Sequence, residues 1–335
     1  MNGLTTPDIE ARSLLLGALT AVVVAVVMVL SIGRLTGFAE LTSTLDDAQW
    51  QWLVLCAVGQ IAVFAGYAGT FRRAVAFDSG PDVSSRFALR VALAGFGLTQ
   101  LVAAGGAAGL AFTYWALRWI GLERRDALVR LIGLNTAVYL VFAAIAWIGA
   151  VLGLVSGEVP ASMAIPWLIA VPVIVIVAAW FTAEDHIGRW TTTTERGFRQ
   201  ALSIGVAAAA WVRRALGMTS GRTILSHAML YWFGDLLSLW AALQAFGVSL
   251  GPAPLIGAYA TGYLAQIIPI PFLATGGVDT ATTLTLTAVG VPVEVALLAV
   301  VAHRIFAFWL PIGPGLWSAA ALSRQGQPTT RTSSR

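Results

Sequence analysis

The chain has 335 residues, of which 58% are hydrophobic and 11% are charged, and its formal net charge is +4. A soluble domain carries about 25% charged residues, so this composition excludes a water-soluble fold. The apolar stretches have the length of membrane-spanning helices, and the short alternating segments typical of a membrane barrel are not visible. We therefore predict an all-α polytopic membrane protein.

Six stretches are predicted to cross the membrane as helices, because each holds about 20 mainly apolar residues. They are residues 14–32, 50–71, 131–154, 165–183, 224–246 and 295–322. The first is followed by Gly33 and Arg34 rather than by a small-residue cleavage site. We interpret it as a retained anchor and not as a signal peptide.

The arginines indicate the orientation, because every one of the 20 basic residues is arginine and cytoplasmic loops are enriched in basic residues. They gather in segments 72–90, 118–130 and 189–222 and in the tail from residue 324. Loops 40–49 and 155–163 contain acids and no arginine. We expect a bacterial plasma-membrane protein with both termini in the cytoplasm, and we interpret the arginines as topology signals rather than a nucleic-acid surface.

Segment 91–117 does not fit a simple span, because it is long and apolar but has arginines on both flanks. Gly105 and Gly106 in its centre weaken a continuous helix. A re-entrant hairpin that enters from the cytoplasm and returns there resolves the conflict. Its candidate functional residues are Gln100, Gly105 and Gly106, together with Asn135 in the following span.

A second interrupted region lies late in the chain, where residues 236–278 carry no formal charge. The run is too long for one span, and its sequence PIPFLATGG breaks it at Pro269, Pro271, Gly276 and Gly277. A bilayer tolerates broken backbone only where protein or a water-filled cavity satisfies the freed polar groups. We predict a re-entrant hairpin near 255–290 that enters from the outer side, opposite in sense to the first.

The sequences of the two interrupted regions can be aligned with each other. Setting Gly121 on Gly290 brings the Ala-Leu pairs that follow each glycine into register and places Asn135 on Arg304. Together with the opposite orientations, this match suggests an inverted repeat. In that architecture, substrate sites lie near the midplane at the interface of the repeats.

The remaining segments complete the predicted organisation. Residues 1–322 are expected to form a single integral membrane domain, and residues 323–335 a disordered cytoplasmic tail. Arginines surround an alanine-rich core near 198–212, so we expect this helix to lie along the inner surface.

Asp279 and Arg304 are the first candidate site residues. An unpaired charge inside a membrane costs at least about 3 kcal/mol, and a hairpin followed by a span could bring the two together. In one interpretation they form a structural pair that locks the hairpin to the last span. In the other, Arg304 holds a lipid phosphate while Asp279 balances it or binds a cationic headgroup.

Three further polar residues lie in apolar surroundings. Asp235 is either a functional carboxylate or a partner in an interhelical hydrogen bond. Gln266, just before the break, either lines the path or joins two helices. If both residues are helical, the His303 side chain points about 100° away from that of Arg304 around the helix axis. His303 is either a proton relay or a structural residue.

Residues 266–311 carry a motif made of a proline-rich break, a glycine turn, an acid, a Gly-Val-Pro sequence and a membrane-embedded arginine. These elements are Pro269 and Pro271, Gly276 and Gly277, Asp279, residues 290–292, and Arg304 in a span ending Phe-Trp-Leu-Pro. The motif resembles the lysylphosphatidylglycerol synthase transmembrane (flippase-like) family, and the sequence WFGDLLSLWAALQAFGV around Asp235 resembles the preceding span of that family. The resemblance covers residues 231–316 well and the rest only in layout.

This chain also departs from the family pattern. Asp279 stands where glutamate is usual. In the first hairpin, AAGGAAG and the Leu134-Asn135 pair replace a proline-containing turn, an acid and a Glu-Arg pair.

The resemblance implies a protein that moves a lipid across the bilayer. The lipid would be a phospholipid, including an aminoacylated one, or a polyprenyl-linked glycolipid. A membrane-embedded transferase acting on a lipid carrier and a non-transporting accessory protein remain alternatives. The sequence has neither clustered carboxylates for metal–diphosphate chemistry nor a nucleophile beside a base, so we predict no catalytic residue, metal or cofactor. A homo-oligomer or a pathway partner is left open.

Overall fold

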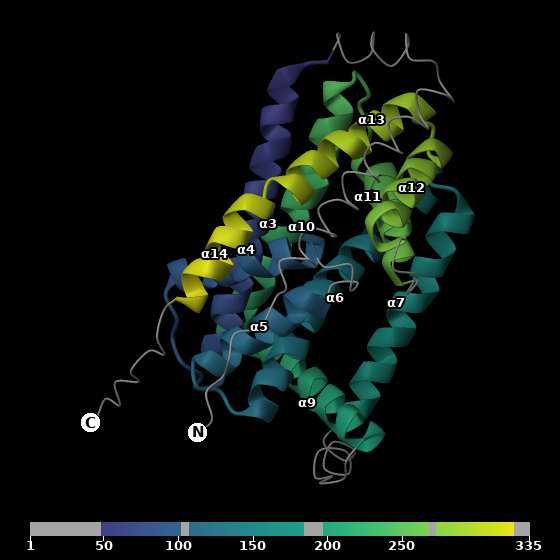
Figure 1. The fold of residues 1–335 in the computed structure, drawn as a ribbon. Helices are drawn as coiled ribbons and strands as arrows, with labels where there is room; N and C mark the ends of the chain where they lie inside the picture. Colours follow the sequence, from purple (N-terminus) through teal and green to yellow (C-terminus); the bar gives the residue numbers. More distant parts are fainter. Residues whose placement is uncertain (1–47, 102–106, 184–196, 268–272, 325–335) are drawn as a thin grey trace.

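A computed structural model describes residues 48–101, 107–183, 197–267 and 273–324 (Figure 1). These residues form helices joined by turns, and no strand occurs among them, which confirms the all-α class. The helices are α3 (Trp50–Ala76), α4 (Ser85–Leu101), α5 (Ala107–Trp119), α6 (Arg124–Ser156), α7 (Ala161–Phe181), α9 (Phe198–Gly217), α10 (Thr219–Ala245), α11 (Pro252–Tyr263), the 3₁₀ turn η1 (Leu264–Ile267), α12 (Leu273–Ala288), α13 (Val293–Arg304), the π-helical turn η2 (Ile305–Trp309) and α14 (Ile312–Ser323).

Four helical segments of the described residues are long and apolar enough to cross a membrane: α3, α6, α7 and the run from α13 through α14. The pair of α9 and α10, bent by 101°, brings the number to five if it forms one broken span. These segments contain the predicted spans at 50–71, 131–154 and 295–322, all but the last residue of the one at 224–246, and most of the one at 165–183. The predicted span at 14–32 lies outside the described residues.

The closest helix crossing joins α3 to α10, which run side by side through the molecule (Figure 1). A Cβ atom added at Gly59 would lie 2.6 Å from the carbonyl oxygen of Gly234 and 2.9 Å from the backbone nitrogen of Ser238. Small residues let helix backbones approach in this way where no hydrophobic driving force between helices is available. The crossing therefore depends on the absence of a side chain at Gly59.

We expect Gly59→Ala to lower the stability of the folded protein by about 1–3 kcal/mol, the usual cost of forcing a methyl group into a packed core. The measurement is thermal unfolding of the detergent-purified protein. Gly205→Ala in α9 is the matched control, because no neighbouring atom would lie within 4 Å of the new Cβ. Alanine favours a helix over glycine, so this control should unfold at the same temperature or slightly higher. Equal losses in both variants would contradict the close crossing.

The described helices have two recognisable ends, which we name after the ends of α3. At the Trp50 end, the backbone nitrogen of Gln49 donates to Ala245 O over 2.9 Å. At the Ala76 end, Arg130 Nη1 donates to the carbonyl oxygens of Ala74 and Val75 at 2.9 and 3.1 Å, which occupies free carbonyls of the last turn of α3.

The two helix pairs, α4–α5 and α11–α12, begin and finish at opposite ends of the described helices. Helix α4 packs on α5, and this pair begins and finishes in the turns on either side of it, at the Ala76 end. Helix α11 packs on α12, and this pair begins after Ala245 and finishes beside the start of α13, at the Trp50 end. Two opposed re-entrant hairpins require this arrangement. The breaks themselves, at 102–106 and 268–272, lie outside the described residues, as do Gly105, Gly106, Pro269 and Pro271.

Two predictions about local structure are settled by the helix bounds. Gly276 and Gly277 were predicted to interrupt the second hairpin, and this is wrong, because both lie inside α12. Glycine costs only about 1 kcal/mol relative to alanine in a helix, which packing against α11 can offset. The predicted helix at 198–212 is present within α9, whose buried Trp211 packs against Gly133 and Phe77.

Candidate functional site

An ion pair between α12 and α13 is the most buried arginine–carboxylate pair among the described residues. Arg304 Nε lies 3.0 Å from each carboxylate oxygen of Asp279. The Asp279 side chain is 7% exposed and that of Arg304 is 25% exposed. The pairing that the sequence predicted is therefore confirmed, and the arginine is the more accessible partner.

The placement of Arg304 leaves part of its guanidinium available. Only Nε engages Asp279, and among the described residues no hydrogen-bond acceptor reaches the two terminal nitrogens. Arg304 is the last residue of α13, and the π-helical turn η2 follows directly. Such turns are rare and occur frequently at functional sites. The arginine can therefore hold Asp279 and still offer donors to an anion.

Asp235 on α10 is the centre of a second polar cluster. Its Oδ1 accepts a hydrogen bond from Gln60 Nε2 of α3 at 2.8 Å. Its Oδ2 accepts one from the hydroxyl of Tyr259 on α11. His303 Nε2 lies 3.7 Å from Oδ1. The carboxylate thus joins α3, α10, α11 and α13 at one point.

His303 and Arg304 are consecutive but serve different helices. His303 Nδ1 lies 3.0 Å from Ser238 Oγ on α10, and this hydroxyl lies 3.0 Å from Cys56 Sγ on α3. Arg304 instead pairs with Asp279 on α12. This divergence follows from the rotation of about 100° between neighbouring residues of a helix, and it makes the end of α13 a junction between the two clusters.

Both clusters line one cavity of about 1700 Å³. Its polar lining residues include Gln60, Asn135, Asp235, Asp279, Arg213, His303 and Arg304. Apolar residues of α6 and α7 form the wall between the clusters and the Ala76 end; they include Ile132, Val171, Ile174, Val175, Ala178 and Ala179. At that end Arg213 donates to the carbonyl oxygen of Thr182, the residue after α7, at 2.8 Å. The cavity therefore combines charged groups with a long apolar wall.

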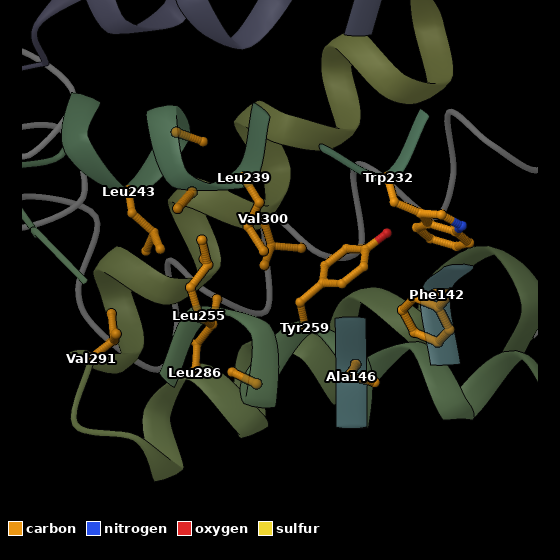
Figure 2. Close-up of a cluster of buried hydrophobic side chains, with 14 of the residues drawn as sticks. Phe142, Ala146, Trp232, Leu239, Leu243, Leu255, Tyr259, Leu286, Val291 and Val300 are labelled. Carbon is orange, nitrogen blue, oxygen red and sulfur yellow. The ribbon is translucent and has the colours of Figure 1, made fainter. Parts of the chain in front are cut away.

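Aromatic side chains stabilise the part of the cavity nearest Asp235. The Trp232 ring lies 4.4 Å from that of Phe142, and its indole nitrogen donates to Val138 O at 2.7 Å. Figure 2 shows Tyr259 beside this pair, with its hydroxyl directed away from the apolar cluster around Leu255 and Leu286. Packing of this kind fixes the rings and thereby holds the tyrosine hydroxyl on Asp235.

The structure brings together only part of the predicted site. Asp235, Asp279, His303, Arg304 and Asn135 all line the cavity. The Asn135 side chain donates to Leu131 O in its own helix at 2.8 Å rather than to another helix. The side chains of Gln100 and Gln266 and the burial of Gly276 lie outside the part of the structure that can be described.

Three polar partners were missed by the sequence reasoning: Gln60, Ser238 and Tyr259. Gln60 could have been found, because an amide in the middle of an otherwise apolar span signals a helix–helix partner. Ser238 and Tyr259 gave no such signal, since hydroxyl groups are common in membrane helices and can form hydrogen bonds with many kinds of partner.

The fold and the site define a helical membrane protein in which two clusters of polar and charged side chains face one large cavity. A family model described as the lysylphosphatidylglycerol synthase TM region matches residues 17–315, and the chain belongs to this family. The match extends the resemblance well beyond residues 231–316. No curated protein matches the chain in sequence.

Proposed function

We propose that this protein is a lipid flippase or a transporter of a lipid-linked substrate. It would move a phospholipid, aminoacylated or not, or a polyprenyl-linked glycolipid across the plasma membrane. The observation that carries the proposal is the cavity, in which the partly exposed Arg304 meets a long apolar wall. An amphiphile with an anionic headgroup needs both surfaces at once.

The size of the cavity supports a lipid rather than a small polar solute. Pockets for small molecules commonly measure about 300–1,000 Å³, and this cavity has about 1700 Å³. Helix α7 supplies much of its apolar wall, and only Met163, Ala164 and Trp167 of this helix are buried. A helix that is apolar and exposed in this way suits contact with bilayer lipid. Acyl or prenyl chains could then lie along α6 and α7 while the headgroup reaches Arg304.

The orientation forms part of the proposal. We place the Ala76 end in the cytoplasm, because the helix ends on both sides of the turns after α3, α5 and α9 are rich in arginine. The α4–α5 pair is then a hairpin entering from the cytoplasm, and the α11–α12 pair one entering from outside. Arg213 would contact the phosphate near the inner leaflet, and Arg304 would contact it deeper in the membrane.

Reconstitution tests this proposal directly. The purified protein is placed in liposomes that contain a fluorescent anionic, aminoacylated or polyprenyl lipid, and dithionite added outside quenches the label in the outer leaflet. We expect quenching beyond the outer-leaflet fraction, in proportion to the number of protein molecules per vesicle. If none of these lipids moves faster than in protein-free vesicles, the proposal is wrong.

A tryptophan placed in the apolar wall should slow transport by roughly tenfold, as filling a substrate path removes favourable contacts worth a kcal/mol or more. Ala179→Trp on α7 is suitable, because Ala179 is exposed and lines the cavity. Ala170→Trp is the matched control, since it lies on the same helix, is also exposed and does not line the cavity. Dithionite-based transport and thermal unfolding are measured for both. Equal transport in the two variants would remove α7 from the path.

A further inference from the structure

We propose that Asp235 and His303 form a proton-binding site, and that proton binding there is coupled to the movement of the lipid. This inference rests on the proposed function and deepens it, because it names the ion that would drive the substrate.

Carboxylates outnumber permanent cations at the end of α13. Among the described residues at the end of α13, two carboxylates, Asp235 and Asp279, face one permanent cation, Arg304. Arg304 is already paired with Asp279, so Asp235 has no permanent counter-charge there. An uncompensated charge in the membrane costs at least about 3 kcal/mol. A proton on His303 would give Asp235 its counter-charge.

His303 lies close enough to Asp235 to form an ion pair with it once the imidazole is protonated. His303 Nε2 lies 3.7 Å from Asp235 Oδ1, and the two side chains are 12% and 13% exposed. This separation is within ion-pair range and somewhat longer than a hydrogen bond. Proton uptake by the imidazole would shorten it and draw the end of α13 toward α10.

The contacts of Asp235 suit a proton better than a larger cation. The two carboxylate oxygens of Asp235 already accept hydrogen bonds from an amide N–H and a phenolic O–H. A metal cation such as Na⁺ or Ca²⁺ would instead need a shell of oxygen ligands. A cationic headgroup would have to displace Gln60 or Tyr259. A proton on His303 requires neither change, so the arrangement favours the proton.

The remaining groups near His303 explain how proton and lipid could be linked. Asp279 of α12, Cys56 of α3 and Tyr259 of α11 lie around the same junction, with Arg304 next in the chain. A lipid phosphate on the terminal nitrogens of Arg304 would share the arginine's positive charge with Asp279 and so weaken the ion pair between α13 and α12. A proton on His303 would strengthen its attraction to Asp235, and so the contact between α13 and α10. The two ligands would thus act on one helix end, which is the requirement for a coupling free energy between sites.

The balance of the proposed step is simple. One proton leaves the water on one side, binds His303 beside the Asp235 carboxylate, and is released to the water on the other side as the lipid changes leaflet. No other reactant is needed. The proton gradient would supply the driving force, and each pH unit supplies a factor of about ten in the leaflet ratio of the lipid for each proton coupled.

The decisive measurement is therefore the steady-state leaflet ratio of a fluorescent anionic phospholipid in proteoliposomes, with and without an imposed pH gradient. We expect a gradient of one pH unit to shift this ratio by about tenfold in the native protein. We expect His303→Gln to equilibrate the lipid with no shift. Glu158→Gln, outside the cavity, is the control and should behave as the native protein. A ratio that ignores the gradient while lipid still moves overturns the coupling and leaves the proposed function standing. Lipid that never moves, at any gradient, overturns both.

A second readout does not depend on transport. The chain has three histidines, so His186→Gln combined with His227→Gln leaves His303 as the only one. Its ¹⁵N imidazole signals in lipid nanodiscs should change from the neutral to the protonated pattern as the pH falls. Addition of Asp235→Asn should move that change to lower pH, because the counter-charge is lost. An imidazole that stays neutral at every pH at which the protein remains folded contradicts the proton site.

Discussion

Arg304→Ala should reduce lipid transport by roughly ten- to a hundredfold, because hydrogen bonds to a charged group contribute about 1.5–3 kcal/mol. In the native protein only Nε of the guanidinium contacts Asp279. The substitution therefore removes the terminal nitrogens that are proposed to bind the lipid phosphate. The dithionite assay in liposomes gives the rate. Arg222→Ala is the matched control, since Arg222 is exposed at the start of α10 and does not line the cavity.

A fold defect must be separated from a transport defect in that experiment. Arg304→Lys keeps the positive charge beside Asp279 but loses the planar fork of donors. We expect this variant to unfold near the native temperature and still transport more slowly. Native transport by a folded Arg304→Ala protein would exclude Arg304 from the mechanism.

The sequence could predict the charged residues of the site because charges are scarce in this chain. Residues 236–278 carry none, so Asp235, Asp279 and Arg304 stand out against an apolar background. A membrane-embedded charge must find a partner, and this principle alone brings Asp279 to Arg304. The same reasoning could have predicted that Asp235 is shared by several helices, but not by which ones.

An uncharged residue such as Gln60 can be recognised as a helix–helix partner, but the group that it contacts could not be predicted, because this depends on which helices come together. Gln60 meets Asp235 only because α3 crosses α10 closely at Gly59 and Gly234. Tyr259 meets it only because α11 returns into the protein beside α10 and α6. Helical periodicity indicates the faces of one helix, and it contains no information about a crossing between segments 175 residues apart.

The breaks show a second limit of the sequence. Gly276 and Gly277 look like helix breakers, yet both belong to α12. The intrinsic cost of glycine in a helix is small, and neighbouring helices override it. That each helix pair starts and ends on one side of the membrane stays a prediction from the arginine distribution, which constrains which ends of a segment share a side.

The ion pair offers a test that separates its structural role from its proposed role in binding. Asp279→Leu alone leaves Arg304 without its counter-charge, and breaking a buried pair in this way costs about 3–5 kcal/mol. We therefore expect this variant to unfold at a clearly lower temperature. In the double variant Asp279→Leu/Arg304→Met, both charges are replaced by apolar groups of similar volume. Such replacements are often neutral or stabilising, so we expect thermal stability to return to nearly the native level.

Transport should not return with stability. The double variant has a packed junction between α12 and α13 but no donor for a lipid phosphate, so we expect it to move lipid as slowly as Arg304→Ala. If the pair only held the α11–α12 pair against α13, restored packing would restore transport as well. A double variant that is stable and transports at the native rate would therefore make the pair a structural lock. One that is stable and inactive would support Arg304 as the group that binds the headgroup.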